Sequence, residues 1–113
     1  MARVLIERSL LREIKKRFAR TEAHRIIDRM ERLQAHPKSG KPLGVVGGIV
    51  IKQIKYRSFR FFFISESDAI RCVDERTLVD RLLSFVRMAH KKHQHETIEE
   101  IKNVLRRLGP EGF

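Results

Sequence analysis

The chain has 113 residues, of which 42% are hydrophobic, and a formal net charge of +11 with its histidines neutral. This length supplies one hydrophobic core and hence one domain, residues 1–113, and the apolar content excludes a chain disordered by composition. A single cysteine, Cys72, excludes an internal disulfide and indicates a reducing compartment, so we expect a cytoplasmic protein. No apolar run reaches membrane-spanning length. The positive charge favours an anionic partner.

This positive charge is concentrated in the middle of the chain. Residues 36–64 contain six lysine and arginine side chains and no aspartate or glutamate, whereas residues 65–80 contain five acids and two bases. A solvated helix or strand usually interleaves the two signs, so the acid-free segment predicts a positive surface for a polyanion, first of all RNA. The six basic residues are Lys38, Lys41, Lys52, Lys55, Arg57 and Arg60.

The first third of the chain predicts a strand and two helices. Residues 3–7 suit a short strand, and apolar residues then recur at helical spacing from residue 8 to residue 35. Ser9 and Thr21 are the expected N-caps, because their hydroxyls can accept from free backbone N–H groups of a first turn. His36-Pro37 ends the second helix, since the residue before proline avoids the helical region. The pattern predicts an αα-hairpin.

The remainder alternates loop, strands and helices. Residues 37–48 hold six glycines and prolines and predict a loop. Residues 49–55 and 59–64 are β-branched and aromatic and predict a hairpin around Tyr56-Arg57-Ser58, and residues 69–73 predict a third strand of a meander. Residues 75–89 predict a helix, although 82–89 alone would also suit a buried strand. Residues 98–108 predict a final amphipathic helix.

This order of elements resembles the RelE/ParE superfamily of toxins from type II toxin–antitoxin systems. The similarity is best in residues 37–64, in the Pro-Lys-Ser-Gly-Lys-Pro-Leu-Gly loop (37–44) and in Tyr56-Arg57-Ser58-Phe59-Arg60 before an aromatic strand. Lys91-Lys92, followed by a basic helix, is more similar to the HigB-like branch. The resemblance implies an α+β fold, with a small twisted, mainly antiparallel sheet, the N-terminal αα-hairpin on one face, a concave basic surface on the other, and a C-terminal helix. The helix near 75–89 is an addition to that pattern.

The resemblance also implies an activity, namely cleavage of mRNA on the ribosome by attack of the RNA 2′-hydroxyl on the adjacent phosphate, without metal or cofactor. Such an endoribonuclease needs cations near the phosphate and a group that transfers a proton. Arg60 and Lys55 match basic strand positions of the family, Lys91 and Lys92 match its basic pair, and His90 is the candidate acid or base. The candidate catalytic residues are therefore Arg60, Lys55, His90 and Lys92, and the candidate RNA-binding residues are Lys52, Arg57, Lys91, Lys41 and Lys38.

Two departures from the family pattern keep other functions open. Many relatives carry a tyrosine or histidine shortly after the basic pair, where this chain has Glu96-Thr97-Ile98, so that side chain is missing unless His93 or His95 substitutes. Roughly fifteen residues of predicted helix also separate Val73 from His90. The alternatives are a ParE-like inhibitor of DNA gyrase and a basic module that only binds RNA or an acidic protein. Expected partners are a cognate antitoxin and mRNA on the ribosome, with no membrane; a homodimer and a toxin–antitoxin hetero-oligomer are both compatible with the sequence.

Histidine and cysteine do not indicate a metal site or a nucleophile. His90, His93 and His95 are close in sequence, but no cysteine or acid completes a usual ligand spacing, so we expect no metal. Cys72 lies in an apolar strand and is expected to be a buried small residue.

Overall fold

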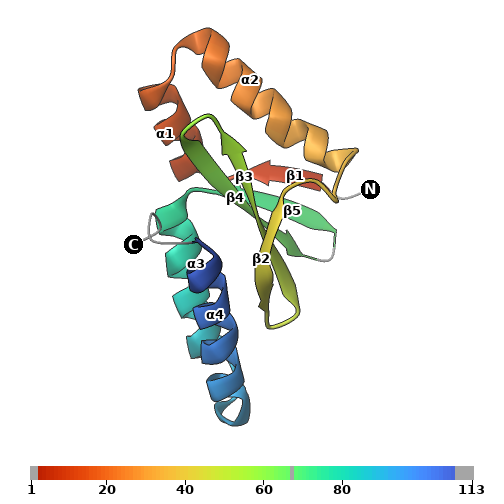
Figure 1. Ribbon diagram of the computed structural model, residues 1–113, viewed down its shortest axis with the longest axis vertical. Helices are drawn as coiled ribbons and strands as arrows, with labels where there is room; N and C mark the ends of the chain where they lie inside the picture. Colours follow the sequence, from red (N-terminus) through yellow and green to blue (C-terminus); the bar gives the residue numbers. More distant parts are fainter. Residues whose placement is uncertain (1–2, 67, 109–113) are drawn as a thin grey trace.

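A computed structural model describes residues 3–66 and 68–108, which form an α+β fold (Figure 1). The strands described are β1 (Arg3–Ile6), β2 (Lys41–Val46), β3 (Ile49–Tyr56), β4 (Phe59–Glu66) and β5 (Ala69–Val73). The helices described are α1 (Arg8–Arg17), α2 (Arg20–Glu31), α3 (Glu75–Met88) and α4 (Gln94–Leu108), with short 3-10 turns η1 (Arg32–Gln34) and η2 (Lys91–His93). Within these ranges no helix is long and apolar enough to cross a membrane.

The strands form one sheet in the order β1-β5-β4-β3-β2. The pairs β2–β3, β3–β4 and β4–β5 are antiparallel, and β1 pairs with β5 in parallel. The prediction of an α+β fold with a mainly antiparallel sheet is thus confirmed. The molecule is elongated, 48 × 33 × 22 Å, because the α3–α4 hairpin extends away from the end that carries α1 and α2 (Figure 1).

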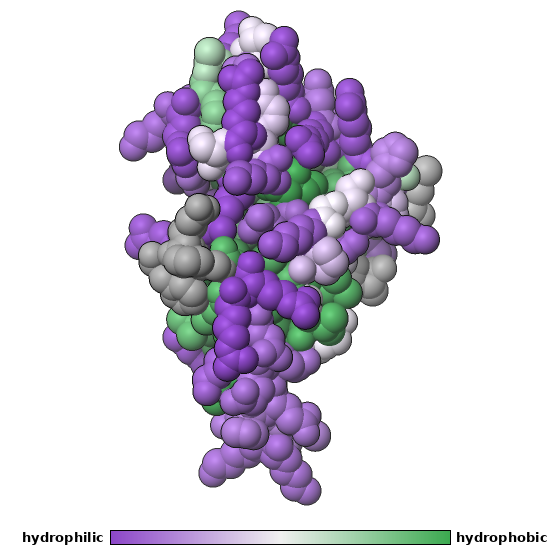
Figure 2. Space-filling model, viewed as in Figure 1, coloured by the Kyte–Doolittle hydropathy of each residue, from purple (hydrophilic) through white to green (hydrophobic). Residues whose placement is uncertain are grey.

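Both faces of the sheet are apolar and both are covered by helices. Phe61 and Phe63 of β4 pack in one buried cluster with residues of α1 and α2, such as Leu10 and Ile26. The alternate side chains of β4 pack in a second cluster with residues of α3 and α4. The second face is therefore not the open basic surface that the resemblance implied. Figure 2 shows that hydrophilic residues dominate both ends of the face in view and that hydrophobic ones appear mainly around the sheet.

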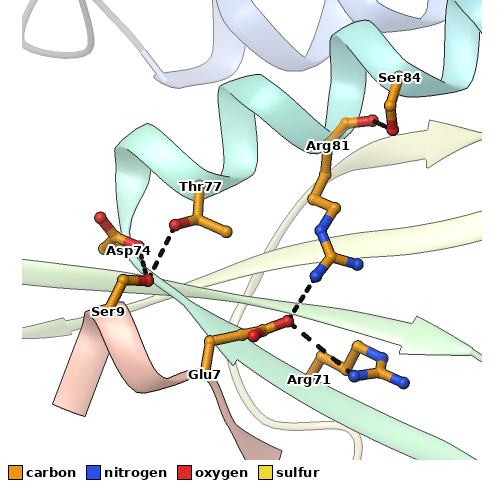
Figure 3. A network of polar contacts seen from close by, with 7 residues as sticks. All are labelled: Glu7, Ser9, Arg71, Asp74, Thr77, Arg81 and Ser84. Atoms are coloured by element: carbon orange, nitrogen blue, oxygen red, sulfur yellow. Dashed lines mark hydrogen bonds and ion pairs between the residues drawn. The ribbon is translucent and has the colours of Figure 1, made fainter.

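A polar network fastens the start of α1 to α3 (Figure 3). Glu7 accepts from Arg81 at 2.7 Å and lies 3.9 Å from Arg71, and Ser9 donates to Asp74 Oδ1 at 3.1 Å. The predicted capping role of Ser9 is wrong, because α1 begins at Arg8 and the hydroxyl reaches another helix instead. The Thr21 cap is also wrong, since α2 begins one residue earlier and has no side-chain cap.

The predicted loop 37–48 contains strand β2, so that prediction is wrong for residues 41–46. A proline and a glycine are compatible with β2 because it is an edge strand, and its register shifts between Pro42 and Gly44. The helix predicted at 75–89 is confirmed as α3, and the strand alternative for residues 82–89 is excluded by it.

Gly40 and Gly48, which flank strand β2, allow a matched test of the backbone path around that strand. Gly40 has φ +96°, and a Cβ there would lie 2.8 Å from Cε1 of the buried Phe63; Gly48 has φ +82° and nothing within 4 Å of such a Cβ. We expect Gly48→Ala to lower the free energy of unfolding by about 1 kcal/mol, from backbone strain alone. Gly40→Ala adds a steric overlap and is expected to lower it clearly further in urea denaturation. Equal losses would contradict the close approach of Gly40 to Phe63.

Candidate nucleic-acid interface

Arg60 is held inside the fold. Its Nη1 donates to the carbonyl oxygen of Leu108 at 2.9 Å, its Nη2 donates to Glu75 Oε1 at 2.5 Å, and its side chain is only 14% exposed. Glu75 is the first residue of α3, and Leu108 is the last of α4. A cation beside the carbonyl end of a helix also interacts favourably with the helix dipole. The contacts of Arg60 are therefore those of a clamp between β4 and the ends of two helices.

Lys52 and Arg57 are also engaged by other parts of the chain. Lys52 Nζ donates to the Pro37 carbonyl oxygen at 3.3 Å and lies 5.9 Å from the centre of the Phe63 ring. Arg57 pairs with Glu22 of α2 at 3.5 Å, although its side chain is 72% exposed. The segment 36–64 thus lacks acids in sequence but obtains some from α2 and α3 in space.

The residues after α3 lie far from Arg60. Arg60 contacts Glu75 at the start of α3, whereas His90, Lys91 and Lys92 follow its end. Fourteen residues separate these ends, which corresponds to roughly 20 Å along the helix axis. Figure 1 shows the α3–α4 turn at the extremity of the molecule. The structure therefore brings Lys55 and Arg60 together as register partners, and it leaves His90, Lys91 and Lys92 apart from them.

Two other candidate residues, Lys41 and Lys55, line a hollow that we call the basic groove. It has a volume of about 640 Å³ and lies between α2, η1, the start of β2 and the end of β3. The groove exists because β2 pairs with β3 only as far as Gln53, so that residues 54–56 of β3 have no neighbouring strand on that side. Its charged and imidazole side chains are Arg29, Arg32, His36, Lys41 and Lys55.

The charge of the basic groove is uncompensated within the described part of the chain. None of the described residues lining it is acidic, and all five of these side chains belong to exposed residues. None of the five has an ion pair or side-chain hydrogen bond to a described residue, in contrast to Arg57 and Arg60. Gln53 also lines the groove, and its Oε1 atom is buried without a hydrogen-bond partner. Such a groove is suited to bind an anion with several negatively charged groups.

Of the basic groove, the sequence predicted Lys41 and Lys55 as site residues. It did not predict Arg29, Arg32 and His36. Arg29 belongs to α2 and Arg32 begins the 3-10 turn η1 that follows it, in a segment where acids and bases are intermixed along the sequence. The available signal was the spacing of three residues, which brings both guanidinium groups to one side of a helix. Lys38 lies beside the groove, in an adjoining hollow that also includes His36.

The hollow beside Arg60 differs from the basic groove, because acids as well as bases line it. The hollow beside Arg60 has a volume of about 470 Å³ and mixes bases with Glu13, Asp74 and Glu75. Cys72 is fully buried, as predicted, and this burial raises the pKa of its thiol to about 12. Within residues 3–66 and 68–108, no three histidine, cysteine or carboxylate side chains come close enough to hold a metal ion.

Comparisons with protein-family models, with curated proteins and with solved structures find no match to this chain. The resemblance to RelE/ParE toxins is therefore a similarity of residue pattern alone, and a function has to be inferred from the geometry of the basic groove.

Arg60 and Lys55, which face each other across the β3–β4 hairpin, are expected to respond differently to truncation. Arg60→Ala leaves the Glu75 carboxylate and the Leu108 carbonyl without their donor and is expected to lower the free energy of unfolding by about 2 kcal/mol. Lys55→Ala removes an exposed side chain that has no partner among residues 3–66 and 68–108, and it is expected to change the free energy of unfolding by less than about 0.5 kcal/mol. Urea denaturation measures both, and a larger loss for Lys55→Ala would refute the clamp.

Proposed function

We propose that the protein binds RNA and that the basic groove holds the RNA phosphate backbone. The observation that supports this most is the uncompensated charge of the groove, in which four cationic side chains and His36 meet no described acid. Guanidinium groups match phosphate oxygens in a bidentate geometry, and lysine supplies a point charge. Arg29 and Arg32 on one wall and Lys41 and Lys55 on the other would contact phosphates from two sides.

The biological role that we propose is that of the RNA-targeting toxin of a toxin–antitoxin pair. The resemblance of residues 37–64 to RelE/ParE toxins supports this role, as does the αα-hairpin packed on a mainly antiparallel sheet. Its targets would be mRNA on the ribosome and, in the inactive state, an antitoxin with acidic groups that occupy the same groove. The proposed RNA surface is at the edge of the sheet, because helices cover both of its faces.

A toxin that inhibits DNA gyrase without cleaving RNA is the second candidate. It is favoured by the separation of His90 and Lys92 from Arg60, which leaves the expected cleavage centre unassembled. Induced expression distinguishes the two candidates. Loss of DNA supercoiling with intact transcripts supports gyrase inhibition, whereas arrest of translation with normal supercoiling supports an RNA target.

Two double variants that each remove two lysines test the RNA-binding groove. Lys41→Ala with Lys55→Ala is expected to weaken binding of a fluorescent single-stranded RNA about tenfold or more, at equal charge loss to the control. The slope of log affinity against log salt should fall by about 1.4 for two lost phosphate contacts. Fluorescence anisotropy over a salt series measures both quantities.

The control is Lys91→Ala with Lys92→Ala at the α3–α4 turn, which lowers the net charge by the same amount. We expect only the small loss that comes from long-range attraction. Equal weakening by both double variants would mean that RNA responds to overall charge, and the basic groove would not be its binding site.

A further inference from the structure

His36 lines the basic groove together with two arginines and two lysines, and a neutral imidazole has a ring nitrogen that can accept a proton. We infer that His36 is the proton-accepting residue of an RNA-cleaving site within this groove. The inference rests on the proposed binding of RNA there. It assigns cleavage to a residue outside the set Arg60, Lys55, His90 and Lys92.

Two hydrogen bonds hold the backbone of His36, whereas its side chain has no partner among the described residues. Its N–H donates to the Arg32 carbonyl oxygen at 3.0 Å, and its own carbonyl oxygen accepts from the Ser39 N–H at 3.1 Å. Pro37 also restricts the backbone of His36, the residue before it. The imidazole is exposed and has no hydrogen bond to a described residue, so both ring nitrogens are open to a ligand. A free imidazole on a fixed backbone is suited to meet a hydroxyl of bound RNA.

The cations around His36 supply the other requirement of cleavage. Arg32 lies one helical turn before His36, Arg29 lies one turn earlier, and Lys41 and Lys55 border the opposite side of the groove. A phosphate held among them gains negative charge as it passes to a five-coordinate transition state. Fixed cations stabilise that charge more in the transition state than in the ground state. The groove therefore combines phosphate binding with a proton acceptor.

The reaction is a transphosphorylation within the RNA. A ring nitrogen of His36 takes the proton of the 2′-hydroxyl, and the 2′ oxygen forms a bond to the adjacent phosphorus. The bond from phosphorus to the 5′ oxygen breaks, and the leaving oxygen takes a proton from water that enters the open groove. His36 then returns its proton to solvent. The products are a 2′,3′-cyclic phosphate and a 5′-hydroxyl, so no metal, oxidant or other reactant is required.

The other four histidines, His24, His90, His93 and His95, do not line the basic groove. His90 already accepts from the Lys92 N–H through Nδ1 at 3.3 Å, and it lies at the α3–α4 turn. His93 lies 3.7 Å from the carboxylate of Glu96. His24 is exposed on α2 and borders a separate hollow with Lys15 and Arg20. His24 and His90 are therefore matched controls, because each is an exposed histidine outside the basic groove.

The test compares His36→Gln with His24→Gln and His90→Gln in the full chain. The substrates are a 5′-labelled single-stranded RNA of mixed sequence and an mRNA on translating ribosomes, and the rate is measured with protein in saturating excess. We expect the wild type to cut at least one substrate and to leave a cyclic phosphate end. His36→Gln should slow the cut by about 100-fold or more even at saturating protein, where a change of RNA affinity does not limit the rate, whereas both controls cut at the wild-type rate.

The inference is overturned if the wild type binds RNA through Lys41 and Lys55 but cuts neither substrate, a result that leaves the proposed RNA binding intact. It is also overturned if His36→Gln cuts as fast as the wild type, or if His90→Gln alone loses cleavage. If RNA affinity does not depend on Lys41 and Lys55, the proposed function itself fails. A 2′-deoxy nucleotide at the cut position should abolish cleavage and preserve binding, and persistent cleavage would refute attack by the 2′-hydroxyl.

Discussion

Strand β4 is central in the sheet and buries side chains on both faces, and this constraint determines where the rest of the molecule can lie. Phe61 and Phe63 point to α1 and α2, and Phe62 and Ile64 point to α3 and α4; each of the four is at most 1% exposed. A strand that is apolar on both sides requires a covering layer on each. The two helical hairpins provide these layers. No sheet face then remains for a polyanion, so an anionic partner can meet the sheet only along an edge.

Arg60 is the exception within β4, and its neutralisation follows from the same packing. It occupies the only charged position among residues 59–64, and its partners Glu75 and Leu108 lie 15 and 48 residues later in the chain. Sequence alone does not distinguish a cation that clamps two helix ends from one that binds a ligand, because the difference lies in those distant partners. Lys55, its cross-strand neighbour, has no such partner among the described residues and remains exposed.

Local patterns predicted most elements, and the errors have local causes. The apolar spacing of Leu78 and Leu82 identified α3, because both side chains are buried against the sheet. Strand β2 was missed because proline and glycine usually mark loops, and only its position at the sheet edge makes them acceptable. For the candidate site, the acid-free segment contains Lys41 and Lys55 of the basic groove. The fold pairs Arg57 with Glu22 and Arg60 with Glu75. It places Lys41 and Lys55 in a groove that α2 also borders, and neither outcome follows from charge counting.

Cations at a strand edge also have a structural role that needs no ligand. Charged side chains on an unpaired strand edge hinder the addition of a further strand from another molecule, and Lys41 and Lys55 are placed to do so. This explanation does not extend to Arg29 and Arg32, which belong to α2 and to the 3-10 turn after it and have no strand edge to protect. Like charges gathered without described counter-charges repel one another and oppose the compact state. An anion in the basic groove would remove that repulsion, and a ligand that binds only the folded protein stabilises it. Cations that have no ion pair with a described residue and that lie beside the start of β2 are thus better explained by a ligand than by protection of the edge.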